Sequence, residues 1–129
     1  MQTGANFESL AQELTRLLNA ASTAGIVRVA IQGTTRDIFF GFKDGQLHID
    51  FSAPGLRGLW YRRKFRQAAA RAELPITTEQ WGPHLVVRAA AGVKPNEVAS
   101  LARKFLHALY GATPGTYLLT IQPHGYSES

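Results

Sequence analysis

The sequence predicts an α+β domain with an antiparallel sheet of five or six strands and helices packed mainly on one face. Three observations lead to this prediction. Apolar residues recur every three to four positions in some segments, as in amphipathic helices, and every second position in others, as in half-buried strands. The segments follow the order α-βββ-α-ββ-α-β, in which strands succeed strands, as is typical of an antiparallel sheet. The dipeptide Asp44-Gly45 between two strand-like segments predicts a tight hairpin, because a type I′ turn needs two residues with positive φ.

The first helix is predicted to begin after Asn6, whose side-chain oxygen can accept a hydrogen bond from the first turn. Its apolar stripe consists of Phe7, Leu10, Leu14, Leu17, Leu18 and Ala21. Three strands are predicted next, at 27–32, 38–42 and 47–52, because apolar residues alternate with other residues in each of them. These strands form an antiparallel meander that ends at Pro54-Gly55.

A second helix is predicted after this break, most clearly from Tyr61 to Glu73. Its apolar face consists of Tyr61, Phe65, Ala68, Ala69 and Ala72. The three alanines allow the helix to lie close against a sheet. Whether Leu56, Leu59 and Trp60 extend this helix is left open, because Gly58 weakens its continuity. Leu74-Pro75 is expected to end it.

The remaining chain predicts two strands at 76–81 and 85–90, a third helix and a last strand at 117–121. Pro95 suits the first turn of the third helix. The apolar face of this helix consists of Val98, Leu101, Ala102, Phe105, Leu106 and Leu109. With 129 residues, the chain fits a single domain, with a core at roughly 6–122 and a frayed tail at 123–129.

The excess positive charge is concentrated in the second predicted helix. Between Pro54 and Leu74 the chain has six arginines or lysines and one glutamate, a net charge of +5 that equals the charge of the whole chain. With the neighbouring aromatic residues, these cations form a candidate binding surface: Arg57, Trp60, Tyr61, Arg62, Arg63, Lys64, Arg66 and Arg71. The surface could simply be solvated, contact phosphates of a nucleic acid, or meet an acidic protein segment or anionic lipid head groups.

Few residues carry a signal for chemistry. The chain has no cysteine, which excludes disulfides, thiolate nucleophiles and cysteine-ligated metals. His48 and Asp50 lie two apart on a predicted strand, so both side chains are on the same face, where a carboxylate could orient an imidazole. No third group accompanies them, and the more common role of such residues is the polar outer face of a half-exposed sheet. We therefore predict no catalytic residue, no metal ligand and no cofactor.

Phe39 is out of phase with the apolar residues of its strand and is expected on the opposite sheet face. An exposed apolar patch that joined Phe39 to Trp60 or Trp81 would mark an interface between proteins. The sequence therefore predicts a homodimer, formed through the outer sheet face or the first helix.

The polar N-terminal residues lack the features of a signal peptide and no long apolar run follows, so we expect a cytoplasmic protein.

The order α-βββ-α-ββ-α between Asn6 and Gly111, with its Asp44-Gly45 hairpin, resembles the type III secretion chaperone-like fold, a group that includes bacterial regulators. The resemblance implies a small homodimer that holds a segment of another protein. The chain departs from the group in its basic character and in its extra strand at 117–121. No motif matches residue by residue, so the resemblance assigns no functional residues.

The leading hypothesis is therefore a protein-binding or chaperone-like module that is not an enzyme. Two alternatives remain open. One is a nucleic-acid-binding protein that uses the basic helix at 57–71. The other is a small enzyme or ligand-binding domain centred on His48 and Asp50.

Overall fold

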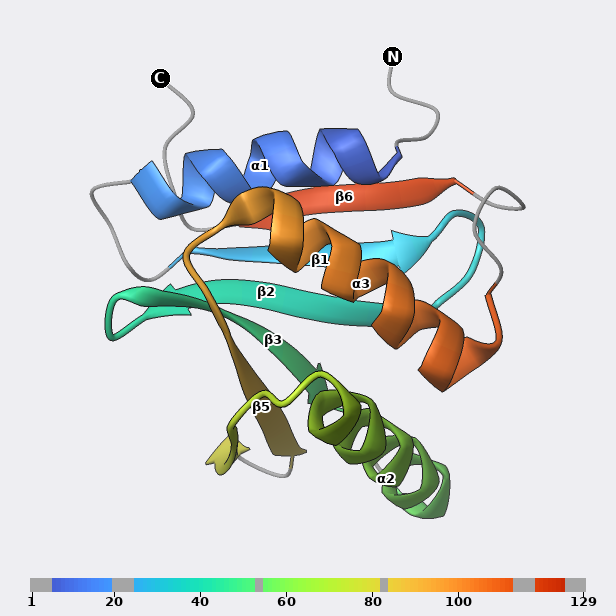
Figure 1. Cartoon of the computed structure of the whole chain (residues 1–129). Coiled ribbons are helices and arrows are strands. Elements are labelled where there is room, and N and C mark those ends of the chain that lie inside the picture. The colour runs from blue at the N-terminus through green and yellow to red at the C-terminus, as the bar shows by residue number, and fades with distance from the viewer. Residues whose placement is uncertain (1–5, 20–24, 53–54, 82–83, 113–117, 125–129) are drawn as a thin grey trace.

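A layer of helices covers one face of a six-stranded antiparallel sheet in the computed structural model, which describes residues 6–19, 25–52, 55–81, 84–112 and 118–124 (Figure 1). The elements are α1 (Phe7–Asn19), β1 (Ile26–Ile31), β2 (Asp37–Lys43), β3 (Gln46–Ser52), α2 (Gly55–Arg71), β4 (Ile76–Trp81), β5 (His84–Gly92), α3 (Pro95–Tyr110) and β6 (Leu119–His124). The predicted α+β class and the predicted order of elements are confirmed.

The sheet order is β4-β5-β3-β2-β1-β6, and every pair of neighbouring strands is antiparallel. The β2–β3 hairpin turns at Asp44 and Gly45, whose φ angles of 54° and 81° are both positive, as a type I′ turn requires. β5 then pairs with β3, and β6 pairs with β1. The first three strands thus form the predicted meander, and the later strands extend it at both sides.

The helices and one face of the sheet enclose the core. Asn6 caps α1, because its Oδ1 accepts a hydrogen bond of 2.9 Å from the backbone N–H of Ser9. α1 packs on β1, β2 and β6, whereas α2 packs on β3 and β5, and both helices contact α3 (Figure 1). The largest fully buried side chains are Phe40, Phe65, Phe105, Leu10, Leu14, Leu17, Ile38, Leu47, Ile49, Leu106, Leu109 and Leu119.

The second helix is longer than its clearest sequence signal. It begins at Gly55 and includes Leu59 and Trp60, so Gly58 does not interrupt it. A single internal glycine costs only about 1 kcal/mol of helix stability, which favourable neighbours can offset. The helix ends where Glu73 adopts a φ of 58° and the N–H of Leu74 donates to the carbonyl of Ala69 at 2.9 Å.

The predicted C-terminal tail starts too early, because β6 includes Pro123 and His124. Pro123 lies opposite Val27 on an edge strand, where a residue without an N–H can face solvent. The predicted start of this strand at 117 lies outside the described residues, as do Ala21, Gly82 and Pro83.

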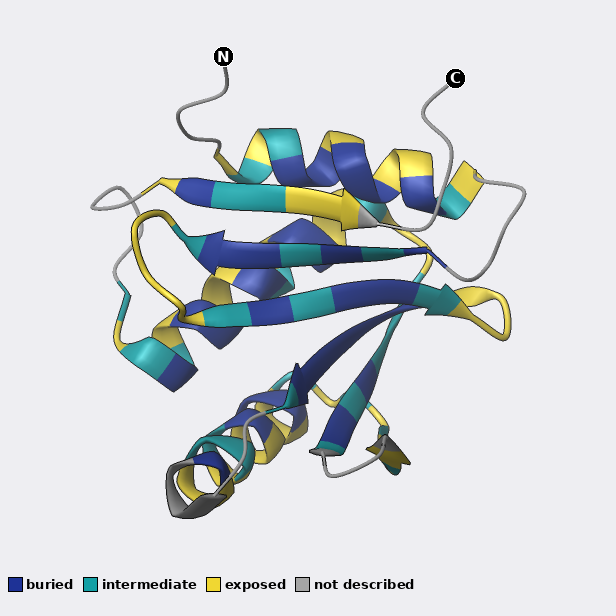
Figure 2. Cartoon of the chain, turned by 180° about the vertical axis from the view of Figure 1, so that it is seen from behind, coloured by how far each residue is buried: buried dark blue, intermediate teal, exposed yellow. Residues whose placement is uncertain are grey.

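The other face of the sheet carries none of the three described helices, and we call it the outer face (Figure 2). Arg28, Phe39, Asp50 and Arg88 lie side by side across its four central strands, because they are paired in register. None of the described helices has the length and apolar character needed to cross a membrane.

Candidate functional site

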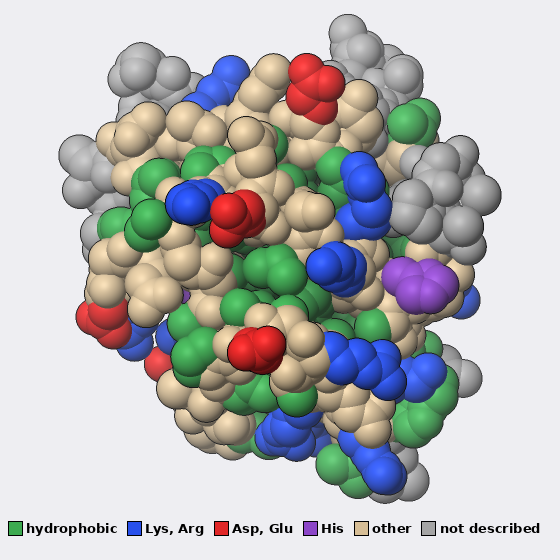
Figure 3. All heavy atoms as spheres, viewed as in Figure 1, with side chains coloured by type: hydrophobic (Ala, Val, Ile, Leu, Met, Phe, Trp, Pro, Cys, Tyr) green, Lys and Arg blue, Asp and Glu red, His purple; other side chains and the backbone are tan. Residues whose placement is uncertain are grey.

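The basic residues of α2 lie mostly on its solvent side. Arg63, Arg66 and Arg71 are exposed, whereas Tyr61, Arg62 and Lys64 are half-buried. The side chain of Arg57 lies outside the described part of the molecule. The predicted positive surface therefore exists along most of the helix, and it continues onto α3 (Figure 3).

Two large apolar side chains of α2 are also on the surface. Leu59 is 55% exposed and Trp60 is 54% exposed. The ammonium group of Lys64 lies 4.1 Å from the ring centroid of Trp60, a cation–π contact that holds charge beside the aromatic face.

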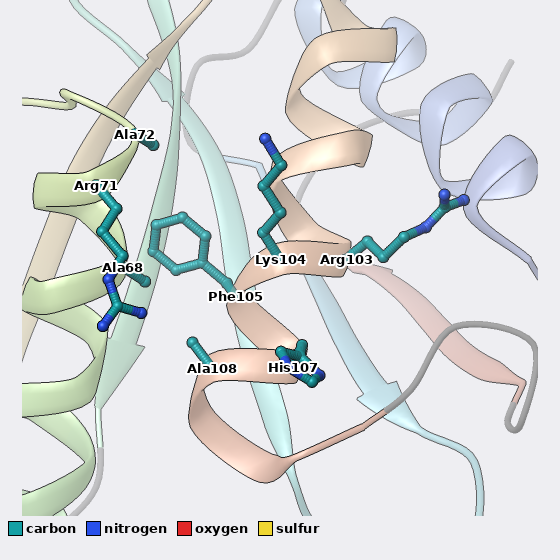
Figure 4. A pocket seen from close by; sticks show the side chains of 8 residues that line it. All are labelled: Ala68, Arg71, Ala72, Arg103, Lys104, Phe105, His107 and Ala108. Atoms are coloured by element: carbon teal, nitrogen blue, oxygen red, sulfur yellow. The ribbon is translucent and has the colours of Figure 1, made fainter.

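A cleft of about 490 Å³ separates α2 from α3 (Figure 4). It is lined by Ala68, Arg71 and Ala72 of α2 and by Arg103, Lys104, Phe105, His107 and Ala108 of α3. Alanine side chains are too short to fill the space between two helices, so facing alanines leave it open. The floor is apolar, because Ala68 and Phe105 are buried there.

Two cations flank this floor from opposite sides. Arg71 stands on α2 and Lys104 on α3, and both side chains are exposed (Figure 4). Arg103 extends away from the cleft toward α1, where its guanidinium carbon lies 4.7 Å from the ring centroid of Phe7. Nδ1 of His107 lies 3.1 Å from the carbonyl oxygen of Ala112 and donates a hydrogen bond to it.

None of the cations around the cleft is neutralised within the described part of the chain. Arg71, Arg103 and Lys104 form no ion pair there. The site therefore combines an apolar floor with positive charge on both walls. Such a surface can bind a ligand that is partly apolar and partly anionic.

A second cluster of charged groups lies on the outer face. Nδ1 of His48 is 2.8 Å from Oδ1 of Asp50, and Arg88 donates to both oxygens of Asp50 at 3.1 Å. Arg88 also donates to Oε2 of Glu79 at 3.1 Å, and Lys43 approaches the same oxygen at 3.4 Å. Burial alone would lower the pKa of Arg88, but its hydrogen bonds to Asp50 and the nearby carboxylates raise that pKa above its ordinary value.

His48 and Asp50 share a face, as predicted, but the expectation of a half-exposed polar face is wrong for them. They are only 7% and 6% exposed. The reason is that Arg88, on the neighbouring strand β5, pairs with Asp50, and Glu79, on β4, pairs in turn with Arg88. This arrangement brings the predicted pair into contact with partners that the sequence did not reveal.

The imidazole of His48 lies over Gly41 on β2. A Cβ atom at Gly41 would lie 2.5 Å from Cε1 and 2.8 Å from Nε2 of the ring, so only glycine fits beneath it. Two hollows, of about 420 Å³ and about 270 Å³, adjoin His48, and both are lined by Lys43, Asp44, Glu79 and Arg88.

The remaining predicted interface residues are only partly placed. Phe39 lies on the outer face, as expected, and is half-buried between Arg28 and Asp50 in register. The side chain of Trp81 lies outside the described residues, so an apolar patch that joins the two stays a prediction.

Comparisons of the chain with protein-family models, with curated proteins and with solved structures found no match. In the ranges that the structure describes, no group of three or more His, Asp or Glu side chains is placed to hold a metal ion. The geometry of the site is therefore the basis for assigning a function.

Proposed function

We propose that the protein is a binding module that holds an acidic, amphipathic segment of another protein in the cleft between α2 and α3. The observation that carries this proposal is the apolar floor of the cleft flanked by Arg71 and Lys104, neither of which has a carboxylate partner among the described residues. A segment with apolar side chains on one face and carboxylates at its borders would satisfy both features.

The two parts of the cleft have different roles in this proposal. Burial of apolar side chains against Ala68, Ala72 and Ala108 supplies affinity, at about 25 cal/mol for each Å² removed from water. The cations on the walls supply orientation and a faster encounter with an acidic partner, and this contribution weakens as salt rises. An amphipathic helix laid into a groove is a known mode of peptide recognition.

The resemblance to the type III secretion chaperone-like fold supports the same proposal, because members of that group hold segments of other proteins. The order of elements on which the resemblance rests is present in the structure. A homodimer is the corresponding proposal for the oligomeric state, and a monomer found by sedimentation at micromolar concentration would contradict it.

Nucleic acid is the second candidate partner, and the observation that favours it is the exposed ring of Trp60 beside Lys64. Bases stack on exposed aromatic rings while cations contact phosphates. We favour the acidic protein segment, because the open space between the helices has an apolar floor, which a polyanionic backbone does not need.

The test is a binding assay with two labelled amphipathic peptides that are identical except that one carries glutamate and the other glutamine. The wild-type protein should bind the glutamate peptide more tightly. The double variant Arg71→Gln with Lys104→Gln should weaken that binding by roughly tenfold, about 1.4 kcal/mol. The matched control is Arg36→Gln in the exposed turn before β2, which also removes a positive charge and should leave affinity unchanged.

Equal binding of the two peptides, or equal effects of the cleft and control variants, would contradict the proposal. Single-stranded DNA that binds more tightly than either peptide, with a steep loss of affinity as salt rises, would establish the nucleic-acid alternative instead.

A further inference from the structure

His48 presents one ring nitrogen that has no partner in the described chain. The carboxylate of Asp50 is held by Arg88 and can only accept hydrogen bonds, so Nδ1 of His48 carries a hydrogen and donates it. In the ring form with a single hydrogen, Nε2 is an acceptor, and none of the described groups donates to it. The residue as a whole is more than nine-tenths buried, and this nitrogen itself reaches solvent, because it is not one of the enclosed side-chain nitrogen or oxygen atoms without a partner.

His48 borders open space on the outer face. Nε2 lies above Gly41, and both Gly41 and His48 line the hollow of about 420 Å³ together with Ile26. Ile26, Gly41 and His48 are paired in register across β1, β2 and β3, so they belong to the same sheet face. The absence of a side chain at Gly41 therefore accommodates the ring and also leaves room beside it.

The charges around this hollow differ in sign from those of the whole chain. The hollow is lined by three carboxylates, Asp44, Asp50 and Glu79, and by two cations, Lys43 and Arg88. Its formal charge is thus −1, on a protein whose net charge is +5. A negatively charged ligand is disfavoured there, and a ligand that carries a positive charge is favoured.

We infer that this hollow is a binding site for a small amine, whose N–H donates a hydrogen bond to Nε2 of His48. A protonated amine meets both requirements of the site, because it is a hydrogen-bond donor and a cation. Asp44, at the border of the hollow, forms no ion pair with any described residue and adds a compensating charge. This site lies on the outer face and is independent of the cleft between α2 and α3.

The test uses ethanolamine as the probe, with sodium glycolate as a matched anion and ethylene glycol as a matched neutral molecule. Imidazole ¹⁵N spectra of the wild-type protein should show a progressive shift of His48 Nε2 with ethanolamine. Glycolate should leave that signal unchanged, and ethylene glycol should shift it only weakly. The ring nitrogens of His107 on α3 serve as an internal reference and should not respond to ethanolamine or to ethylene glycol.

Variants separate binding from structural support. His48→Phe keeps a flat ring near Gly41 but removes the acceptor, and it should weaken ethanolamine binding at least roughly tenfold, as followed through the amide signal of Gly41. Asp44→Asn should weaken binding about threefold, because it removes an exposed charge near the amine. His107→Phe is the matched control and should bind as the wild type does.

An equal response of Nε2 to glycolate would overturn the inference, as would a His48→Phe protein that binds ethanolamine unchanged. A wild-type His48 signal that does not move with ethanolamine would also overturn it, and this measurement does not depend on whether any variant folds. Failure here leaves the peptide-binding proposal intact, because the peptide assay reports only on the cleft.

Discussion

On the outer sheet face Arg88 is paired with Asp50 and Glu79, whereas on the helical face Arg71 and Lys104 have no carboxylate partner among the described residues. The side chain of Arg88 is only 11% exposed, and those of Arg71 and Lys104 are in contact with solvent. These positively charged side chains therefore differ by face: the one on the outer face is buried and paired, and the two on the helical face are exposed and, among the described residues, unpaired.

The difference follows from the cost of removing charge from water. A buried charge needs a nearby partner, because the loss of its hydration costs several kcal/mol. An exposed charge keeps its hydration and needs no partner within the chain. The paired charges on the outer face therefore join neighbouring strands, while the exposed charges on the helical face stay hydrated.

The largest effect is expected when a buried pair is broken. Arg88→Met should lower the free energy of unfolding by about 3–5 kcal/mol, because it leaves the buried carboxylate of Asp50 without its cation. Arg71→Met should change it by no more than about 0.5 kcal/mol. Urea unfolding followed by circular dichroism measures both values, and similar losses in the two variants would remove the contrast between the faces.

The next effect concerns the glycine under the imidazole. Gly41→Ala should cost about 1–3 kcal/mol, because the new Cβ would lie 2.5 Å from the His48 ring. In the double variant with His48→Ala this additional cost should vanish, since the ring is no longer there. If Gly41→Ala costs the same with and without the ring, the two positions are not in steric conflict.

On the helical face, filling the cleft should change binding more than stability. Ala108→Leu places a larger apolar side chain in the cleft, where Ala108 is only half-buried. Binding of the acidic peptide should fall roughly tenfold while the unfolding midpoint stays close to that of the wild type. Unchanged peptide affinity would show that the segment binds elsewhere.

The smallest of these free-energy changes is expected at the hydrogen bond that joins α3 to β2. The hydroxyl of Tyr110 donates to the carbonyl of Asp37 at 2.8 Å, and burial raises the pKa of Tyr110 above its ordinary value. The folded pKa exceeds the unfolded value of about 10, so this contribution to stability is complete below about pH 10 and is lost as pH rises further.

Tyr110→Phe should therefore lower the free energy of unfolding by about 1 kcal/mol at neutral pH, through the lost hydrogen bond. The variant should also lose less stability than the wild type between neutral and strongly alkaline pH. Urea titrations at several pH values provide the measurement, and parallel pH profiles for the two proteins would contradict the assignment.

The fold was largely predictable because its signals are local. Phe65 and Ala69 follow the helical period that buries one face of α2, and Asp44-Gly45 specifies its hairpin through backbone conformation. The tail predicted at 123–129 begins too early, because Pro123 lies in an edge strand, where a proline is tolerated, and edges are assigned only once the strand order is known.

The sites were less predictable because they depend on contacts between distant segments. His48 and Asp50 stand out as a pair, but Arg88 joins them only through the register between β3 and β5. Likewise Lys104 and Arg71 line one cleft only because α3 packs beside α2. A single sequence predicts which residues of an element share a face. It does not predict which residues from other elements will contact that face.

The close approach of the His48 ring to the backbone at Gly41 has an evolutionary consequence. Relatives of this chain should not diversify freely at either position. A bulkier residue at 41 is expected only together with a smaller residue at 48, so substitutions at these two sites should covary.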